Sequence, residues 1–560
     1  MWHNCLRNCY VVSNSELSRL FSIFAELLLL HDKNVRLAGL LPGAAYRLKR
    51  MNAEVMEVAV KELAAQFRPQ VAGIIRELKN TGTISALDEL ITLTPPGLFE
   101  MVSIRGLGGK KLSSLWKVAK IDTIEGLHDA ARSGKLRNVP GFGAKTEQNI
   151  LKAIETYNVS RDRFHYATVA DSADALVKQM QKVFSTKLVS LCGEVRRQTL
   201  TVEGIEIIAA VPALKFRSAA LRKSLVALTS AKGISHAHTF DEIPVTIYHT
   251  TQKKFTGELF IRTGSAAHVE KVMAKIKSDG AFASEEAIYK KASLPFIVPE
   301  MREDLAEWNF KSKTPRLVTH DDIKGVVHNH TTWSDGVDSL PDFVNGCKTR
   351  GYEYVVIADH SRNAHYAGGL KEERALQQLK AINDLNKKLK GFRIFKGIEC
   401  DILVSGELDY GRDLLKQYEV VIVSVHQLLK MDESKATKRL IQAIENPFTT
   451  ILGHMTGRKL LLRPGYPVNA KKVIDACAAN NVIIEINANP YRLDMDWTHI
   501  PYAIKKGVMI SIDPDAHSIA EIDNIRWGVS AARKGGLTTD MTWNAMPASG
   551  VVKWLKENRK

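Results

Sequence analysis

Cysteine is scarce in this chain, with only 6 in 560 residues. The six stand at positions 5, 9, 192, 347, 400 and 477, and no two of them form a Cys-x-x-Cys pair. This spacing excludes a disulfide framework and a zinc-ribbon pattern. We therefore expect reduced thiols.

Long apolar runs are missing as well. The longest one, Phe21 to Leu30, is interrupted by Glu26 and is far shorter than the roughly 20 residues of a membrane-spanning helix. Arg7 is the only Lys or Arg before Ser13, and Glu16 precedes the apolar stretch, so a secretory signal is not expected. We expect a cytoplasmic protein without a membrane partner.

Acidic residues are too few to balance the basic ones, and the formal net charge is +17. Residues 319–560 hold 33 Lys and Arg against 29 Asp and Glu; subtracted from the totals of 78 and 61, this leaves 45 against 32 for residues 1–318. The basic excess therefore lies in the front part of the chain. It favours a polyanionic partner such as nucleic acid, and a solvated basic surface without a partner is the alternative.

Several types of segment precede residue 324. Apolar residues recur at helical spacing from Glu16 to about Asn80, and residues 81–157 continue as short helices. Strand-like runs at 188–191, 205–211 and 243–248 mark an α+β region, and residues 300–323 are predicted as a linker. The predicted domains are 1–80, 81–157, 158–299 and 324–560, with 300–323 between the last two.

The final region alternates apolar runs of strand length with helix-length segments. The runs are 326–327, 354–358, 392–398, 420–425, 449–452, 482–486 and 508–512. Seven strands that alternate with helices predict a parallel, barrel-like sheet. In such barrels, functional side chains gather at the carboxyl ends of the strands.

Donor side chains follow six of these seven runs. The first run ends in His328 and His330, whose spacing of two places them on the same side of a strand. The others end in Asp359-His360, Glu399, His426, His454 and Asp513-Pro514-Asp515-Ala516-His517. A single histidine at a strand end is more often a hydrogen-bonded structural residue. Six filled ends without a thiolate are instead typical of a catalytic zinc, manganese or iron site.

In their order along the chain, His-x-His-x4-Asp-Gly, Ala-Asp-His, Gly-Ile-Glu, Ser-Val-His, Gly-His and Asp-Ala-His resemble the polymerase and histidinol phosphatase (PHP) domain. The resemblance implies a distorted (βα)7 barrel with up to three divalent ions, Mn2+ first and Zn2+ or Fe2+ as alternatives. It implies that Glu399 bridges two ions. The ligands it implies are His328, His330, Asp335, His360, Glu399, His426, His454, Asp515 and His517.

Clustered divalent ions make hydroxide from water near neutral pH and hold phosphate oxygens, so the expected reaction is phosphoester hydrolysis. Glu399, Asp515 and Arg458 are the expected catalytic residues. Arg458, Lys459 and Arg492 lie just beyond strand ends and are candidates to hold the substrate phosphate, with ordinary surface charges as the alternative.

Two Gly-x-Gly turns stand before helical segments in the front region, at Ile104-Arg105-Gly106-Leu107-Gly108-Gly109-Lys110 and at Val139-Pro140-Gly141-Phe142-Gly143-Ala144-Lys145. A turn of this kind presents backbone N–H groups to an anion, and a nearby lysine adds charge. The pair resembles tandem helix-hairpin-helix motifs, which hold the DNA backbone without reading sequence. We expect Gly106, Gly108, Lys110, Gly141, Gly143 and Lys145 to contact DNA phosphates.

The order of these pieces resembles bacterial family X DNA polymerases (PolX) over nearly the whole chain. In the middle region, Leu191-Cys192-Gly193-Glu194-Val195-Arg196-Arg197 is similar to that family's Gly-Ser-x-Arg-Arg nucleotide-binding signature, and Thr263-Gly264-Ser265 to its Thr-Gly-Ser element. The resemblance implies an 8 kDa-like helical domain, a fingers-like hairpin region and a nucleotidyltransferase-like palm and thumb before the PHP barrel.

The polymerase site that this resemblance implies is degenerate. Gly204, Glu206 and Thr246 stand where the family has three magnesium-binding aspartates, so one carboxylate of three remains. Glu194 replaces the serine beside the incoming triphosphate, where a like charge repels it. We expect that nucleotidyl transfer is lost. An alternative alignment uses Glu203, Glu206 and Asp241 as the acidic set.

We therefore expect a DNA-repair protein whose PHP barrel is a 3′-5′ exonuclease, with cleavage at abasic sites or removal of 3′ phosphates as further activities in base-excision repair. Gapped, nicked or single-stranded DNA ends are the expected partners, and a nucleoid-associated monomer is the expected form. A gap-filling polymerase and a phosphatase for a small phosphomonoester such as histidinol phosphate are the alternatives.

Overall fold

The computed structural model describes residues 13–48, 51, 53–104, 106–217, 221, 224–276, 281–310 and 313–558. Cys5, Arg7, Cys9 and Arg105 lie outside these residues. The chain divides into two compact units, 1–161 and 162–560. Within the described residues, Cys192, Cys347, Cys400 and Cys477 are buried free thiols. No described helix has the length and apolar character needed to cross a membrane.

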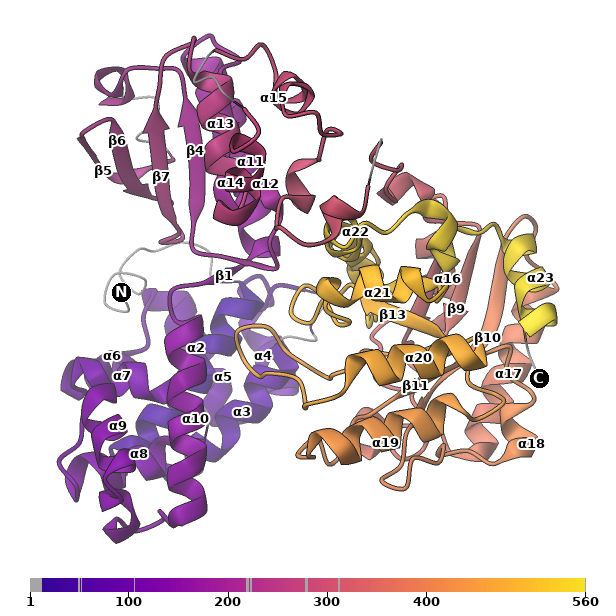
Figure 1. Ribbon diagram of the computed structural model, residues 1–560. Helices are drawn as coiled ribbons and strands as arrows, with labels where there is room; N and C mark the ends of the chain where they lie inside the picture. Colours follow the sequence, from indigo (N-terminus) through magenta and orange to yellow (C-terminus); the bar gives the residue numbers. More distant parts are fainter. Residues whose placement is uncertain are drawn as a thin grey trace. The chain divides into compact units, whose positions relative to one another are not determined.

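The first unit is made of helices (Figure 1). Its longest helices are α2 (Asn14–Leu30), which Ser13 and Glu16 begin with a capping box, and α10 (Ala144–Ser160). The others are α3 (Val35–Leu48), α4 (Val60–Gln66), α5 (Pro69–Thr81), α6 (Ser85–Leu93), α7 (Pro96–Val102), α8 (Gly109–Lys117), α9 (Ile124–Arg132) and the 3-10 helix η1 (Lys135–Asn138). One apolar cluster runs from Leu17 to Ile154. The predicted boundary at residue 80 therefore does not separate two cores.

The second unit begins with a mixed sheet in the order β2-β4-β7-β6-β5. Its strands are β2 (Val189–Leu191), β4 (Ile205–Ala209), β5 (Val226–Ala231), β6 (Ile234–His238) and β7 (Pro244–His249). Only the β4–β7 pair is parallel. Strand alternation sends Ile205 and Ile207 to one face, against α11 (Tyr166–Val183), and Ile208 to the other, against α13 (Phe255–Thr263).

Shorter elements complete this region. They are β1 (Phe164–His165), α12 (Gly193–Arg197), β3 (Thr201–Val202), η2 (Ala213–Arg217), α14 (Ala266–Met273) and α15 (Glu285–Lys291). The segment 300–323, predicted as a linker, is folded in its described part: it holds η4 (Pro299–Met301), η5 (Ala306–Asn309) and η6 (His320–Asp322). Met301, Ala306 and Leu317 are buried with Phe260 and Tyr289. The charged residues of the segment suggested a solvent-exposed linker. Arg302, Glu303 and Glu300 instead pair with residues outside the segment: Glu285, Arg197 and Arg533 respectively.

The final region is a parallel sheet of seven strands in sequential order, from β8 to β14. They are β8 (Gly325–Asn329), β9 (Tyr354–Ile357), β10 (Arg393–Asp401), β11 (Val420–Ser424), β12 (Ile451–Leu452), β13 (Ile483–Asn487) and β14 (Ile510–Asp513). A bridge between Asn329 and Ala516 brings the two edges together, and the N–H of His330 donates to the carbonyl of Ala516 at 2.8 Å. The predicted barrel is confirmed as a nearly closed one.

Helices surround this barrel (Figure 1). They are α16 (Leu340–Thr349), α17 (Glu372–Asn386), α18 (Arg412–Leu415), α19 (Glu433–Ile444), α20 (Ala470–Asn480), α21 (Ile500–Lys505), α22 (Ile525–Lys534) and α23 (Ala548–Asn558), with short 3-10 turns η7 (His365–Ala367), η8 (Trp497–His499), η9 (Ile519–Asn524), η10 (Thr539–Met541) and η11 (Trp543–Ala545). Alternate strand residues such as Val355 and Ile357 pack outward on the helices. Tyr354, Val356 and Phe395 fill the interior.

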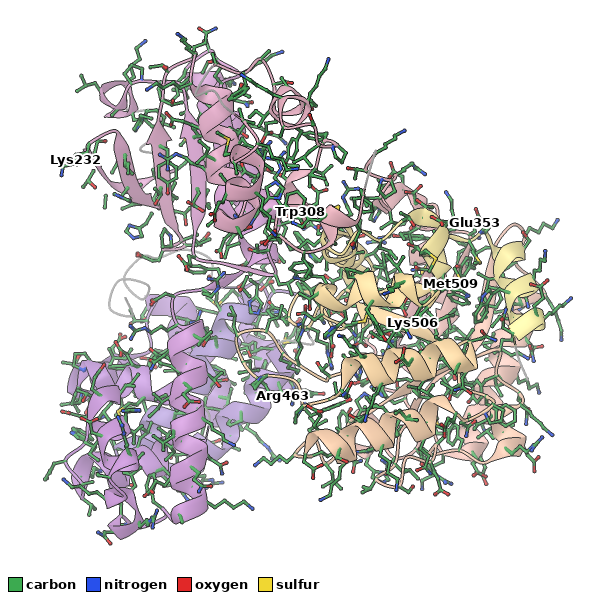
Figure 2. The ribbon with its side chains drawn as sticks, in the orientation of Figure 1. Lys232, Trp308, Glu353, Arg463, Lys506 and Met509 are labelled. Carbon is green, nitrogen blue, oxygen red and sulfur yellow. The ribbon has the colours of Figure 1, made fainter. Side chains whose placement is uncertain are left out.

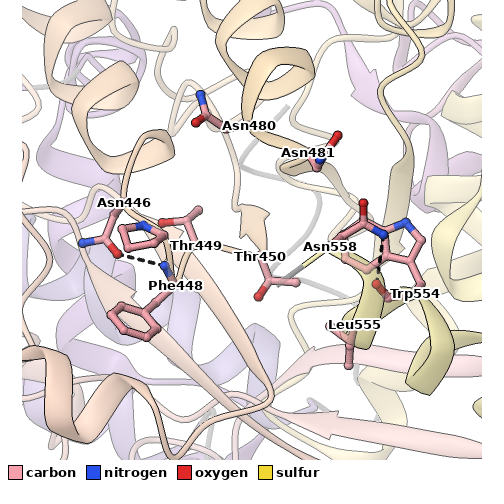
Figure 3. A pocket seen from close by; sticks show the side chains of 10 residues that line it. Asn446, Phe448, Thr449, Thr450, Asn480, Asn481, Trp554, Leu555 and Asn558 are labelled. Atoms are coloured by element: carbon pink, nitrogen blue, oxygen red, sulfur yellow. Dashed lines mark hydrogen bonds between the residues drawn. The ribbon is translucent and has the colours of Figure 1, made fainter. Parts of the chain in front are cut away.

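The amino ends of the barrel strands carry a polar hollow (Figure 3). Thr450 and Asn481 line it, and they directly precede β12 and β13. Trp554 and Leu555 of α23 line it from the other side. This hollow lies at the end of the strands opposite to the predicted ligands, so it is not part of the site described next.

Candidate metal centre

The carboxyl ends of the strands bring the nine predicted ligands together. Glu399 on β10 lies at the centre of this group, and its side chain is 1% exposed. We call this residue the hub of the site. Glu399 has the same strand parity as Phe395, which fills the barrel interior, so alternation directs both side chains inward. The site thus sits on top of the apolar interior, where the parallel strands end.

Four imidazoles surround the carboxylate of Glu399. The Nε2 atoms of His328, His426 and His454 each lie 3.1 Å from Oε1 of Glu399. On the other oxygen, Oε2, Nδ1 of His360 lies at 2.8 Å. A carboxylate with both oxygens facing different imidazoles has the geometry to bridge two cations.

A second group forms beside this hub. Asp335 Oδ1 lies 3.4 Å from Nε2 of His517 and 3.7 Å from Nε2 of His360. Nε2 of His330 lies 3.1 Å from Oδ1 of Asp515. Ligand atoms fall within 4.8 Å of one another in three overlapping sets: His330, Asp335, His360 and His517; His328, His330 and Asp515; and His360, Glu399 and His426. Three overlapping sets are compatible with the ions, up to three in number, that the resemblance implies.

Backbone strain accompanies two of these residues. His328 has a φ of +60° and Asp515 a φ of +52°. The β8–β9 register shifts between Val326 and Asn329, which marks a bulge at His328. The backbone at His328 thus departs from simple strand alternation, yet His328 and His330 both offer ligand atoms to one set with Asp515, as their spacing of two predicted.

The charges of the cluster favour cations. Burial raises the pKa of the Glu399 carboxyl, but the adjoining His426 and His328 outweigh it and hold that pKa well below its usual range. Asp335 behaves alike: burial opposes ionisation, yet hydrogen bonding to His517 and the charge of His330 lower its pKa to about 2. Burial opposes ionisation of Asp515 too, but His328 and His330 hold its pKa well below the usual range. Glu399, Asp335 and Asp515 therefore stay ionised in an enclosed site, which requires compensating positive charge.

Protons supply part of that charge in the metal-free protein. Burial lowers the pKa of His426, but Glu399 and Asp401 raise it to about 10. For His517, burial also opposes protonation, while Asp335 and Asp515 raise its pKa to about 9. His330 differs, because burial, His517 and His360 together lower its pKa to about 3.

Unsatisfied atoms at the centre fit a metal. Nε2 of His328, Nδ1 of His330 and Oε2 of Glu399 are buried and make no hydrogen bond of normal geometry, even though His328 and His360 lie close to the Glu399 carboxylate. An unpartnered buried polar atom costs about 1 to 3 kcal/mol, so several in one cluster need a ligand that the protein itself does not provide. Imidazole and carboxylate donors suit zinc, manganese or iron.

Three residues of an outer layer were missed by the sequence analysis. Nδ1 of His328 is bonded to the carboxylate of Glu485, and Nδ1 of His426 lies 2.6 Å from Oδ1 of Asp401. Asn487 donates to Glu485 at 3.0 Å and to Asp515 at 2.9 Å. Such partners fix the tautomer and orientation of ligand imidazoles. One sequence feature could have revealed Glu485. It is a glutamate inside the apolar run 482–486, and that run belongs to the one strand to which no ligand was assigned.

Basic side chains near the mouth of the barrel have different surroundings. The guanidinium of Arg458 is held by the carboxylate of Asp496 and by the carbonyls of Arg492 and Leu493. Arg492 instead directs Nε toward Asp515, with 3.8 Å to Oδ2. Burial, followed by the charges of Arg492 and Arg463, lowers the pKa of Lys459. Arg492 and Lys459 therefore face the centre more directly than Arg458, whose predicted catalytic role gains no support from these contacts.

The two Gly-x-Gly turns of the first unit differ at the start of the helix that follows each of them. Gly106, Gly108 and Lys110 of the first turn are exposed, as are their counterparts in the second turn. Gly106 and Gly141 have φ values of +90° and +87°, as the turns require. In the first turn the N–H of Gly109 donates to Glu26 Oε2 at 2.5 Å, so a carboxylate of the chain already occupies this helix start. In the second turn, Gly141, Gly143 and Lys145 are exposed, and a Cβ added at either glycine meets nothing within 4 Å.

Comparison with known proteins connects both parts of the chain. Residues 99–156 match the family model described as a SAM-like helix-hairpin-helix tandem. The "DNA polymerase/3'-5' exonuclease PolX" of Bacillus subtilis (strain 168) is 33% identical over 511 residues, which are 87% of this chain and 89% of that protein. The chain belongs to the PolX family.

Shorter relatives match less than half of the chain. A "Probable phosphatase" of Thermoanaerobacter sp. (strain X514) is 26% identical over 251 residues, 42% of this chain and 95% of that protein. Another from Shewanella frigidimarina is 24% identical over 231 residues, 40% of this chain and 88% of that protein. Each of these relatives is therefore matched over most of its own length by one part of the PolX chain.

The four polymerase-site positions lie in the middle region of this PolX chain. Glu206 on β4 pairs in register with Thr246 on β7. The hydroxyl of Tyr248 donates to Oε1 of Glu206 at 3.0 Å. A Cβ at Gly204 would lie 2.5 Å from the carbonyl oxygen of Pro244, so a larger residue does not fit there without a shift. Glu194 is paired with Arg163 at 2.7 Å and accepts from the N–H of Glu203 at 3.0 Å. Gly204 and Thr246 thus bring no carboxylate beside Glu206.

The arginines of the nucleotide-binding signature are engaged elsewhere in this PolX chain. Arg196 bonds both oxygens of Glu285, at 3.0 and 2.5 Å. Nε of Arg197 donates to Glu303 at 3.0 Å, and Lys534 on α22 donates to the same carboxylate at 2.6 Å. These side chains therefore hold protein groups together, from the middle sheet to the barrel helix.

Proposed function

We propose that the barrel hydrolyses phosphodiester bonds at the 3′ ends of DNA strands, with Mn2+ as the first metal to test and Zn2+ or Fe2+ as alternatives. The convergence of four imidazoles on the two oxygens of Glu399 carries this proposal. The Bacillus subtilis relative is named as a 3'-5' exonuclease, which supports DNA as the substrate. Cleavage at abasic sites and removal of 3′ phosphates are the related activities that we propose for base-excision repair.

The residues of the site have different proposed roles. We propose that His328, His330, His360, His426, His454 and His517 hold the ions together with Glu399, Asp335 and Asp515. When bound, such ions supply an activated water near neutral pH and neutralise charge on the phosphate. Asp401 and Glu485 hold the rings of His426 and His328 in place. Arg492 and Lys459 offer positive charge to the phosphate beside Asp515.

Access to the centre comes from the side of Asp335 and His517. Their side chains are 22% and 34% exposed, whereas His328 and His330 are fully buried. A substrate phosphate reaches the accessible side, and the enclosed imidazoles keep the deeper ions away from solvent. Enclosure strengthens each charge interaction with the phosphate, because water no longer screens it.

We further propose that the second helix-hairpin-helix turn makes the main contact with the DNA backbone. The predicted contact residues are exposed in both turns, but the carboxylate of Glu26 already binds a backbone N–H of the first turn. The match of residues 99–156 to a helix-hairpin-helix tandem supports this role. The middle region then serves as a scaffold without nucleotidyl transfer, since Glu206 is the single carboxylate among the three positions compared.

A labelled strand tests the nuclease and its location together. A 5′-labelled single-stranded oligonucleotide is incubated with Mn2+ and the wild type, His328→Ala or Glu206→Ala. We expect shortening of the strand by the wild type and by Glu206→Ala, and loss of at least 100-fold in rate for His328→Ala because a ligand of the hub is gone. Equal loss in Glu206→Ala would move the activity to the middle region. Histidinol phosphate is then added as a competitor. If it were hydrolysed in preference to the oligonucleotide and stopped its digestion, a small phosphomonoester would be favoured as the substrate instead.

A further inference from the structure

Large apolar side chains are exposed on the loops that surround the metal centre. Tyr366, Val404, Leu428, Leu462 and Tyr491 are exposed by 67, 66, 65, 59 and 52%. They follow β9, β10, β11, β12 and β13 respectively, so five consecutive strands each send one such side chain to the mouth of the barrel. Scattered apolar side chains are normal on a surface, but a series at one rim marks a binding surface.

Tyr366 is a member of this rim that lies directly beside two of the predicted ligands. Its ring centre is 6.0 Å from that of His360 and 6.4 Å from that of His426, with the planes at 60° and 63°. One edge of the ring thus rests on two predicted ligands while the rest faces solvent. An aromatic face in this position is within reach of whatever adjoins the reacting phosphate.

The loop that carries Tyr366 is held in place. The N–H of Leu370 donates to the carbonyl of His360 at 2.8 Å, and the hydroxyl of Tyr410 donates to the carbonyl of Leu370 at 2.5 Å. A Cβ at Gly369 would lie 2.0 Å from the carbonyl oxygen of Ser361, so the turn closes tightly on itself. A ring held this way loses little conformational entropy when a ligand stacks on it.

Positive charge adjoins the aromatic rim. Tyr491 is followed by Arg492, whose Nε lies 3.8 Å from Oδ2 of Asp515. Arg463, labelled in Figure 2, lies on the loop after β12. Its charge and that of Arg492 both act on Lys459, so the three cations lie near one another. The ring of Tyr491 also packs edge-on against His165, at 4.8 Å between centres. Flat apolar faces interleaved with cations, beside a phosphoesterase centre, match single-stranded nucleic acid, which offers bases and phosphates in alternation.

We propose that Tyr366 and Tyr491 stack on the bases next to the scissile phosphate and so make the rate of hydrolysis depend on those bases. The inference rests on the proposed nuclease function and names two residues that set its specificity. A base that stacks on either ring adds binding that the sugar-phosphate backbone alone does not receive.

Two oligonucleotides of equal length test the stacking role. One has ordinary nucleotides throughout, and the other has abasic residues at its last two 3′ positions. We expect the wild type to digest the ordinary strand about 5- to 100-fold faster in kcat/KM, the range given by one stacked base. In Tyr366→Ala this advantage shrinks toward one, with the loss confined to the strand that carries bases, whereas Tyr366→Phe retains it.

Leu376→Ala is the matched control, because Leu376 is an exposed apolar residue of the same barrel but lies on α17. It should keep the wild-type ratio. If Tyr366→Ala slowed both oligonucleotides equally, the ring would only support the ligands and the stacking role would be refuted. An unchanged ratio would refute it as well and would leave a protein partner for this rim. If the wild type digested neither strand, the proposed nuclease itself would fail.

Discussion

Replacement of Asp401 by asparagine separates the outer layer of the metal centre from the ligands. Asp401 is 1% exposed, and its Oδ1 lies 2.6 Å from Nδ1 of His426. Its other oxygen accepts from Asn363 at 2.7 Å. Asparagine keeps the shape and can still accept from His426, but it removes the negative charge that makes this imidazole a stronger donor to a cation.

The expected loss follows from this single contact. Loss of an outer partner of a ligand imidazole typically costs 10- to 100-fold in metal affinity, which is about 1.4 to 2.8 kcal/mol. The Asp401→Asn protein should therefore need roughly 10 to 100 times more Mn2+ for half-maximal nuclease activity. At saturating metal its kcat should approach that of the wild type, because all nine predicted ligands remain.

Activity titrated with Mn2+ in a metal-buffered solution measures this shift. Asp409→Asn is the control: Asp409 is also buried, but it pairs with Arg362 and accepts from the N–H of Asn363. It should change the metal requirement little. The reasoning would be refuted if Asp401→Asn had the wild-type metal requirement, or if Asp409→Asn shifted it equally.

Two further predictions concern pH and DNA. Because the pKa of His426 is raised to about 10 and that of His517 to about 9, both groups stabilise the metal-free protein fully below pH 6.5, and this stability is lost as the pH rises through 9 to 10. The melting temperature of the protein in the presence of a chelator should fall over that pH range. Isothermal titration calorimetry at pH 7.5 should show that metal binding releases protons, and no protons would be released if the rings were already neutral. Lys145→Ala should weaken binding of labelled DNA and reduce the salt dependence of that binding by about one ion, while Lys110→Ala should do less; equal effects in fluorescence anisotropy would remove the distinction between the two turns.

The barrel was predictable because its signals are local. Each strand is a short apolar run, and in a parallel sheet the residue after such a run has a fixed place at the carboxyl edge. Glu399, His426 and His454 follow this rule directly. His328 does not, since the bulge that turns its ring depends on how β8 pairs with β9, which no pattern in the sequence records.

The outer layer and the folded linker were harder to predict for a related reason. A carboxylate such as Glu485 resembles any other glutamate in the sequence, and only the packed barrel shows that it faces His328. Arg302 and Glu303 look like solvent-exposed linker residues, yet Arg302 is fully buried and bonded to the carbonyl of Ile297 at 3.0 Å. Charged residues are assigned to the surface by default, so buried ion pairs escape a sequence-based prediction.

Those buried pairs also give the signature arginines a structural role in the polymerase-like region. Glu303 binds both Arg197 of the middle region and Lys534 of α22, and the ammonium of Lys534 donates further to the carbonyls of Arg197 and Glu300. Removal of one partner from such a cluster leaves an uncompensated charge, at a cost of about 3 to 5 kcal/mol. These ion pairs stabilise the fold whether or not the region binds a nucleotide. The presence of the signature arginines in the sequence is therefore by itself no evidence for nucleotidyl transfer.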